Sequence, residues 1–365
     1  MTATLAALAG ASVGAGPDPP EKRGASEAPA RSERAVDRLS LKQQVGQTLL
    51  LSFRGSDPPD YVLELLRKRR VAGVVLFGDN VVSRNQLREL TREIQRAARG
   101  RAVVATDQEG GSIRQVPFAA PAEGQAAQAG EREAASAARD GASDLRSSGV
   151  NVNLAPIADV AAEAGSAVGE RAYPGDADVV AASVGASVRS HLRAGVLPTP
   201  KHFPGFGSAQ ANTDDEPVTI DTRRARIVKR DLEPFVAAVR AGAPLIMASH
   251  ALYPALDRRR IASQSPTVLQ GLLRRRLGFR GVVVTDSIEA EAVLDRSLVE
   301  VAGVRSVAAG ADLVLMTGPG SYTPVYERLL ARARRSPGFR RRVEESAERV
   351  LALGEDLRRR APDAR

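Results

Sequence analysis

Short apolar runs recur along the chain, and most of them end at a polar or charged residue. There are eight such runs, at residues 47–53, 73–77, 102–106, 152–154, 196–200, 244–249, 281–285 and 313–315. Most are followed by a longer helical pattern, which is clearest over residues 61–70, 84–98, 131–148, 177–194 and 224–241. Nearly continuous Val, Ile and Leu runs that alternate with helices indicate parallel strands covered on both faces.

Eight strand–helix units predict a single α/β domain folded as a (β/α)8 barrel of the TIM type. The active site of such a barrel lies at the C-terminal ends of its strands. The polar residues cluster at those ends here, as Arg54, Asp79, Asn80, Asp107, Asp159, Lys201, His202, His250, Asp286 and Thr317. A doubly wound open sheet is the alternative, but no Gly-x-Gly-x-x-Gly motif follows the first run to favour it.

The segment after the fifth run is the most unusual one. Lys201 and His202 are followed by Phe-Pro-Gly-Phe-Gly, so a cation and an imidazole stand where a strand ends and a glycine-rich loop begins. Lysine rarely lies beside a core strand without a partner or a function, which favours a functional site. A Gly-Pro turn with a buried histidine is the alternative.

Composition is consistent with one enzyme-like domain, expected over residues 40–355 with a helix starting at Ser40. The chain has 365 residues, 43% of them hydrophobic, and no cysteine, so a disulfide or a thiolate site is excluded. No apolar run is long enough for stable insertion into a membrane.

Both ends of the chain are expected to lie outside this domain. Residues 1–39 predict a disordered leader and linker, in which residues 2–16 resemble a secretory signal truncated at its start. Residues 356–365 form a basic tail. A secreted or cell-envelope protein is expected if the leader is a truncated signal, and a cytoplasmic one otherwise.

The net charge of +9 comes largely from arginine runs, such as residues 258–260, 274–276, 340–342 and 358–360. These runs lack interleaved aromatic residues, so no nucleic-acid partner is predicted. The arginine runs are explained equally well by affinity for an anionic cell envelope or by a bias in the coding sequence. The three histidines, His191, His202 and His250, form no His-x-His or His-Glu-x-x-His pair, so neither a metal nor a cofactor is predicted.

Six motifs in order resemble those of family 3 glycoside hydrolases, in the single-barrel β-N-acetylhexosaminidase branch. They are Asp-Gln-Glu-Gly-Gly at 107–111, Asn-Leu-Ala-Pro-Ile-Ala-Asp-Val at 153–160, Gly-Glu-Arg at 169–171, Lys-His-Phe-Pro-Gly at 201–205, Met-Ala-Ser-His at 247–250 and Val-Thr-Asp at 284–286. The resemblance runs from about residue 41 to about residue 353. Larger β-glucosidase relatives take their acid/base from a second domain, for which this chain is expected to have no room.

The resemblance implies a role for each matching residue. Asp286 is expected to be the nucleophile that forms a glycosyl-enzyme intermediate, although a helix N-cap is a second reading of this residue. The expected sugar-binding residues are Asp107, Arg171, Lys201, His202, Arg114 and His250. The family often has an arginine at the place of Gln115, whereas this chain has Arg114 one position earlier.

The loop after the fifth run departs from the family pattern. The family's loop carries an Asp-Ser-His sequence whose Asp–His pair is the general acid/base. Here Phe206 replaces a further histidine, Asn212 falls at the place of the aspartate and Asp214 at the place of the catalytic histidine. We therefore expect Asp214 to be the acid/base, with Asp215 and Glu216 as alternatives.

Three functions are compatible with these residues. The first is a monomeric, retaining exo-glycosidase that removes terminal β-linked N-acetylglucosamine from glycans such as peptidoglycan fragments. The second is the same chemistry on another β-glycoside, such as a glucoside. The third is a sugar-binding barrel that has lost its acid/base.

Overall fold

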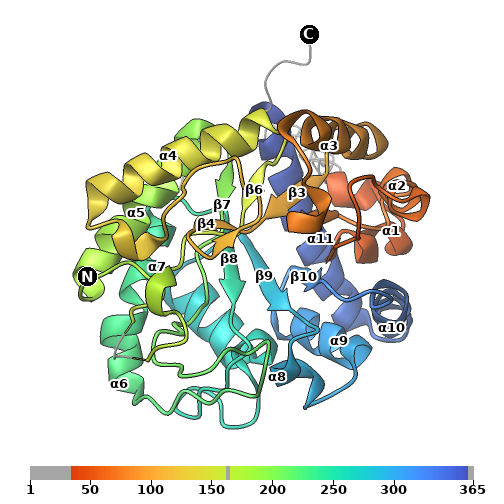
Figure 1. Ribbon diagram of the computed structural model, residues 1–365. Helices are drawn as coiled ribbons and strands as arrows, with labels where there is room; N and C mark the ends of the chain where they lie inside the picture. Colours follow the sequence, from red (N-terminus) through yellow and green to blue (C-terminus); the bar gives the residue numbers. More distant parts are fainter. Residues whose placement is uncertain (1–33, 162–164, 361–365) are drawn as a thin grey trace, which may run out of the picture. The chain divides into compact units, whose positions relative to one another are not determined.

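The computed structural model describes residues 34–161 and 165–360, and one compact unit begins at Ala35. Its main sheet has eight parallel strands in the order β7-β6-β3-β2-β1-β10-β9-β8 (Figure 1). The strands are β1 (Leu49–Leu51), β2 (Gly73–Leu76), β3 (Val103–Thr106), β6 (Val152–Asn153), β7 (Leu197–Pro198), β8 (Leu245–Ala248), β9 (Val282–Ser287) and β10 (Leu313–Met316). Each of the eight apolar runs coincides with one of them, although β9 and β10 extend one or two residues past their predicted runs.

Backbone hydrogen bonds join the two ends of this sheet, so that it closes into a barrel. The N–H of Met247 donates to the carbonyl of Pro200 at 3.0 Å, and the N–H of Phe203 donates to the carbonyl of Met247 at 2.8 Å. The N–H of Ser249 then donates to the carbonyl of Phe203 at 2.9 Å. The predicted (β/α)8 barrel is confirmed, and the open-sheet alternative is wrong.

Helices surround the strands (Figure 1). They are α1 (Leu41–Gly46), α2 (Asp60–Arg67), α3 (Arg84–Ala98), α4 (Glu131–Ser147), α5 (Ala177–Ala194), α6 (Arg224–Arg226), α7 (Glu233–Arg240), α8 (Glu291–Leu294), α9 (Val299–Ala309), α10 (Tyr322–Arg335) and α11 (Pro337–Arg360). The other described helical elements are two π-helical segments, η5 (Ile227–Asp231) and η7 (Thr267–Arg276), and five 3-10 turns, η1 (Ala35–Arg38), η2 (Gly78–Asn80), η3 (Gln125–Ala127), η4 (Gly169–Arg171) and η6 (Ala262–Gln264).

Side-chain alternation along each strand separates the barrel interior from the layer beneath the helices. In β1, Leu50 packs in one cluster with Leu245, while Leu49 and Leu51 pack in another with helix residues such as Leu87. Strand residues point to opposite faces in turn, which produces this division. Leu353 of α11 packs in the same cluster as Leu50, so this last helix contributes to the core within the strands.

The ends of the unit differ from the expected domain limits. Ser40 caps α1 through a capping box with Gln43, as its position at a helix start predicted. However, η1 precedes it and buries Val36. Helix α11 runs to Arg360, so the first half of the predicted tail is helical. Most of the predicted leader, residues 1–33, lies outside the described residues, as does 361–365.

A short hairpin interrupts the first part of the barrel, and the sequence did not reveal it. Strand β4 (Gln108–Gly110) follows β3 after one residue and pairs antiparallel with β5 (Ile113–Arg114). Gly110 has φ +96°, and a Cβ there would lie 2.1 Å from the carbonyl oxygen of Glu123, so only glycine fits.

None of the helices in the described ranges is long and apolar enough to cross a membrane.

Asp312, which precedes β10, holds a cluster of positive charges against the barrel. Its side chain is fully buried and accepts hydrogen bonds from Arg274, from Arg342 at 2.6 Å and from Arg349 at 3.0 Å. The backbone N–H of Val283 also donates to it at 2.9 Å. One buried carboxylate therefore connects η7, α11 and two strands.

Replacing this carboxylate should destabilise the barrel strongly. Asp312→Ala is expected to lower the free energy of unfolding by about 3–5 kcal/mol, because three guanidinium groups and an N–H lose their acceptor. Urea denaturation measures the change. The control Asp140→Ala removes an exposed partner of Arg139 and should cost below about 1 kcal/mol. Equal losses in the two variants would contradict this role of Asp312.

Candidate active site

A cavity of about 310 Å³ opens at the C-terminal ends of the strands, within the ~300–1,000 Å³ typical of small-molecule sites. Its lining comes from the C-terminal ends of strands, or the segments after them, at β2, β3, β6, β7, β8, β9 and β10. Six residues expected in the site line it together: Asp107, Arg171, Lys201, His202, Asp214 and Asp286. The other lining residues are Phe77, Glu109, Ile113, Gln115, Phe206, Asn212, Thr213, Ser249, Ser287, Leu315 and Thr317.

Lys201 lies at the centre of the charged part of this cavity. Its side chain is only 3% exposed, and its Nζ lies 2.5 Å from Asp107 Oδ1 and 2.6 Å from Glu109 Oε1. Burial would lower the pKa of Lys201, but the two carboxylates raise it, so the ammonium stays charged. Burial also raises the pKa of Asp107, against the opposing charge of Lys201.

Glu109 extends this pair into a chain of alternating charges. Arg171 donates to it twice, from Nε at 2.9 Å and from Nη2 at 2.8 Å, in a bidentate pair. Burial would raise the pKa of Glu109, but Lys201 and Arg171 lower it to about 2. The side chain of Glu109 is 1% exposed, so it positions the two cations rather than opening to solvent. The sequence contained this residue within a motif, but its role was missed.

His202 is oriented by a second carboxylate whose role was also missed. Asp159 accepts from Nδ1 of His202 at 2.8 Å, so Nδ1 carries the proton and Nε2 faces the cavity. Asp159 also accepts from the backbone N–H of Phe206 at 2.6 Å and from that of His202 at 3.1 Å. The ring of Phe206 packs edge-on against the imidazole, with the centroids 5.8 Å apart. This single carboxylate therefore shapes the loop after β7.

Asp286 lies near the end of β9, facing His202. Its Oδ2 is 3.7 Å from His202 Nε2, and its Oδ1 accepts from the N–H of Ser287 at 2.9 Å. Burial would raise the pKa of Asp286, but His202, His250 and Lys201 outweigh it and lower the pKa. Helix α8 begins at Glu291 with Ala290 as its N-cap, so the helix-cap reading of Asp286 is wrong.

The loop that carries Asp214 is attached to the start of α8. The carbonyls of Thr213 and Asp214 accept from the N–H groups of Ala292 and Glu291 at 3.1 and 3.2 Å. Loss of surrounding water raises the pKa of Asp214, and the charge of Asp286 raises it further. Neither Asp215 nor Glu216 is among the residues that line the cavity.

Two expected sugar contacts lie outside the cavity lining. Arg114 donates from Nε to the carbonyl of Ala119 at 3.1 Å, whereas its neighbour Gln115 lines the cavity. His250 is fully buried and contacts Ser263 Oγ at 2.7 Å, so it cannot touch a bound sugar directly. It is close enough to Asp286 to help lower the pKa of that carboxylate.

Among residues 34–161 and 165–360, no three His, Asp or Glu side chains are arranged to hold a metal ion.

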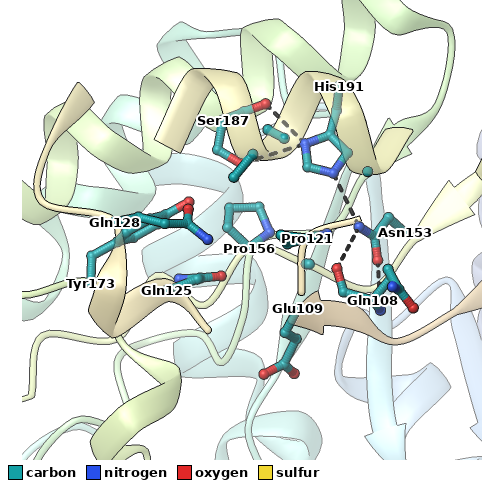
Figure 2. A pocket seen from close by; sticks show the side chains of 14 residues that line it. Gln108, Glu109, Pro121, Gln125, Gln128, Asn153, Pro156, Tyr173, Ser187 and His191 are labelled. Carbon is teal, nitrogen blue, oxygen red and sulfur yellow. Dashed lines mark hydrogen bonds between the residues drawn. The ribbon is translucent and has the colours of Figure 1, made fainter. Parts of the chain in front are cut away.

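Three buried polar residues, His191, Asn153 and Gln108, support the hairpin that carries Glu109. Figure 2 shows His191 and Asn153 joined to Gln108 around a cavity of about 20 Å³, with the Glu109 carboxylate directed away from them. Burial lowers the pKa of His191 to about 4, so its ring is neutral. Its Nδ1 donates to the carbonyl of Ser187 at 2.9 Å, and its Nε2 accepts from Asn153 at 3.0 Å. Bonds between Asn153 and Gln108 in turn hold β6 and β4 together behind the site.

A closed parallel barrel with carboxylates and cations gathered around one polar cavity is the architecture of an enzyme that binds a small polar substrate. Residues 40–353 match the profile of the Glycosyl hydrolase family 3 N terminal domain. The chain belongs to this family and is a glycoside hydrolase, with a carbohydrate as its substrate.

Two relatives show how far the similarity extends. An uncharacterized secreted glycosyl hydrolase of Arthroderma benhamiae is 33% identical over 331 residues, which cover 86% of this chain and 93% of that protein. A beta-hexosaminidase of Xanthomonas oryzae pv. oryzae is 35% identical over 281 residues, which cover 74% of this chain and 84% of the relative.

Solved structures share the fold. A family 3 beta-N-acetylglucosaminidase from Paenibacillus sp. str. FPU-7 has a TM-score of 0.84 and 32% identity over 90% of this chain, and the match spans 64% of that protein. Beta-N-acetylhexosaminidase from Beutenbergia cavernae has a TM-score of 0.81 and 29% identity over 87% of this chain and 99% of its own.

The ionic chain through Glu109 should contribute measurably to stability. Glu109→Gln is expected to lower the free energy of unfolding by about 3 kcal/mol at pH 7, because a buried ion pair loses one partner. The pKa of Glu109 is lowered from 4.5 to about 2 on folding, so this contribution is complete above pH 4.5 and is lost as the pH falls through 2.

Urea denaturation at pH 7 and at pH 3 tests both statements. The control Glu131→Gln breaks a 2.8 Å pair with Arg189 that is more than 40% exposed on both sides, so it should change little at either pH. A loss no larger than that of the control would show that Glu109 is not paired as described.

Proposed function

We propose that this protein is a retaining exo-glycosidase that removes terminal β-linked N-acetylglucosamine. The observation that carries the proposal is the pair of carboxylates in one cavity with oppositely shifted pKa values. Asp286 has a lowered pKa and suits a nucleophile, whereas Asp214 has a raised pKa and suits a proton donor.

The remaining cavity residues suit the rest of a pyranose ring. Asp107 and Arg171 offer charged hydrogen-bonding groups to sugar hydroxyls, and Lys201 holds Asp107 in place. His202, fixed by Asp159, directs Nε2 toward Asp286 at the reacting end of the cavity. The N-acetylglucosamine preference is supported by the named activities of the Xanthomonas, Paenibacillus and Beutenbergia proteins.

The proposed reaction has two steps. Asp286 attacks the anomeric carbon while Asp214 gives its proton to the departing glycosidic oxygen, so the sugar becomes bonded to Asp286. Asp214, now ionised, then takes a proton from water as the water attacks the same carbon and releases Asp286. The product sugar keeps the β configuration.

A panel of nitrophenyl β-glycosides tests the substrate assignment. Hydrolysis of the N-acetylglucosaminide should exceed that of the glucoside. The reverse order would favour the β-glucosidase alternative, and no hydrolysis of either, together with measurable sugar binding, would favour a binding protein. The family resemblance implies peptidoglycan fragments as the natural substrate. Release of N-acetylglucosamine from purified fragments tests this substrate assignment separately.

Export is a separate part of the proposal. We place the reaction outside the cytoplasm, which is supported by the small, apolar composition of residues 2–16 and by the secreted Arthroderma relative. Fractionation of cells that express the whole chain should find it outside the cytoplasm. Recovery only in the cytoplasmic fraction would contradict the placement.

Asp286→Asn should nearly abolish turnover while sugar binding survives, because the amide keeps the size of the carboxylate but is a poor nucleophile. A slowly released fluorinated glycoside should leave a covalent label on Asp286 of the unmodified protein, detected by peptide mass spectrometry. The control Asp140→Asn changes an exposed carboxylate and should keep full activity. A label on another residue would overturn the assignment.

Asp214→Ala should slow hydrolysis of substrates with poor leaving groups by about 10²–10⁴, and slow nitrophenyl glycosides far less, since these leave without a proton. Azide should partly restore the second step. The control Asp215→Ala changes the adjacent carboxylate, which does not line the cavity. Equal losses on both substrate types, or a larger loss in the control, would remove Asp214 from this role.

The pH profile follows from the same two carboxylates. Activity requires Asp286 ionised and Asp214 protonated, so it should rise with pH through the lowered pKa of Asp286. It should fall again through the raised pKa of Asp214, giving a bell with an acidic optimum. In Asp214→Ala, the alkaline fall should flatten for nitrophenyl substrates. An unchanged alkaline limb would assign that limb to another group.

A further inference from the structure

A separate hollow, of about 600 Å³, is lined by the segment that follows β8, by the turn after α8 and by helix α9. Figure 1 shows α8 and α9 next to each other. Four of its lining residues are arginines: Arg259, Arg260, Arg296 and Arg305. The others are Ile261, Gln264, Pro266, Ala308 and Ala309. It shares no residue with the lining of the active-site cavity.

Nearby side chains compensate little of the positive charge that lines this hollow. Its lining contains no Asp or Glu. In the part of the chain that the structure describes, an ion pair is recorded for only one of the four arginines. That pair joins Arg260 to Asp257 at 3.9 Å, and the arginine side chain is 59% exposed. Four like charges converging on one hollow repel one another, and a bound anion would relieve that repulsion.

The hollow also contains an unpaired hydrogen-bond donor. Gln264 is 6% exposed, and its side-chain amide nitrogen is buried without a hydrogen-bond partner among the described residues. An unsatisfied buried donor costs free energy, so native structures rarely keep one without a reason. Gln264 is part of the lining, so a ligand bound in the hollow would bring an oxygen atom close to this amide.

We propose that this hollow is a binding site for a ligand with two or more phosphate groups. Guanidinium groups present several N–H donors in a plane and bind phosphate oxygens in pairs, which distinguishes arginine from lysine as a phosphate ligand. Four arginines from two separate segments of the chain, with the buried amide of Gln264 in the same lining, match a multiply charged phosphate better than a single carboxylate. The site is independent of the proposed glycosidase function.

Two sources of such a ligand share this chemistry. One is a soluble condensed phosphate, for which inorganic pyrophosphate is the probe. The other is a phosphodiester polymer, for which a glycerol-phosphate oligomer is the probe. Tighter binding of pyrophosphate at equal phosphate concentration would identify the soluble class, and tighter binding of the oligomer would identify the polymer.

Isothermal titration of both probes, at an ionic strength fixed with sodium chloride, tests the site. The double variant Arg296→Ala with Arg305→Ala should bind the better probe at least tenfold more weakly than the unmodified protein. The matched control is Arg340→Ala with Arg341→Ala, which removes the same charge from exposed positions on α11 and should bind within twofold. Lysine at 296 and 305 should give an intermediate loss, because charge remains but paired donors are lost.

Several results would overturn the proposal. These are no measurable binding of either probe, equal weakening in the α11 control, or full affinity in the double variant. Thermal unfolding and nitrophenyl glycoside hydrolysis, measured on each variant, should be unchanged, because none of the four substituted arginines lines the active-site cavity. Unchanged hydrolysis with lost phosphate binding separates this site from the glycosidase site.

Discussion

Lys201 carries a full charge into the interior at the end of β7, and a buried charge must be paired. The residues that pair it come from elsewhere: Asp107 follows β3, and Glu109 belongs to the hairpin after it. Through Glu109 the same requirement fixes Arg171. The arrangement of Asp107, Glu109 and Arg171 at this end of the cavity therefore follows from the neutralisation of one ammonium group.

Asp159 is the carboxylate that organises the part of the cavity around His202 and Asp286. It holds His202 and the backbone of Phe206, so the glycine-rich loop leaves the barrel in one direction. Asp286 then faces an imidazole whose free nitrogen is determined by that bond. The two carboxylates proposed for the chemistry differ because their surroundings differ. Positive groups around Asp286 lower its pKa despite its burial. Burial raises the pKa of Asp214, and the negative charge of Asp286 raises it further.

The fold was predictable because strand and helix periodicities are local properties of sequence. Each of the eight apolar runs coincides with a barrel strand, and α3 and α5 begin and end at the predicted residues. The gathering of Asp107, Lys201 and Asp286 was predictable too, since parallel strands end on one side of a barrel. The hairpin of β4 and β5 escaped notice because each of its strands is too short to show a period.

The partners within the site were less accessible to sequence reasoning. Glu109 and Arg171 are 62 positions apart, and only the folded chain shows that they pair. Arg114 was expected in the cavity, but the hairpin directs its side chain to a backbone carbonyl and leaves Gln115 in the lining. The sequence alone does not show which way a charged side chain points, because that direction depends on how the strands pair.

The stereochemistry of hydrolysis tests the account most directly. Asp286 is the proposed nucleophile, so the configuration at the anomeric carbon should be inverted twice and the sugar released with its original configuration. Proton NMR, recorded within the first minutes of hydrolysis of a nitrophenyl N-acetyl-β-glucosaminide, reports the anomer before mutarotation mixes the two forms. The account predicts that β-N-acetylglucosamine appears first. First appearance of the α anomer would contradict it.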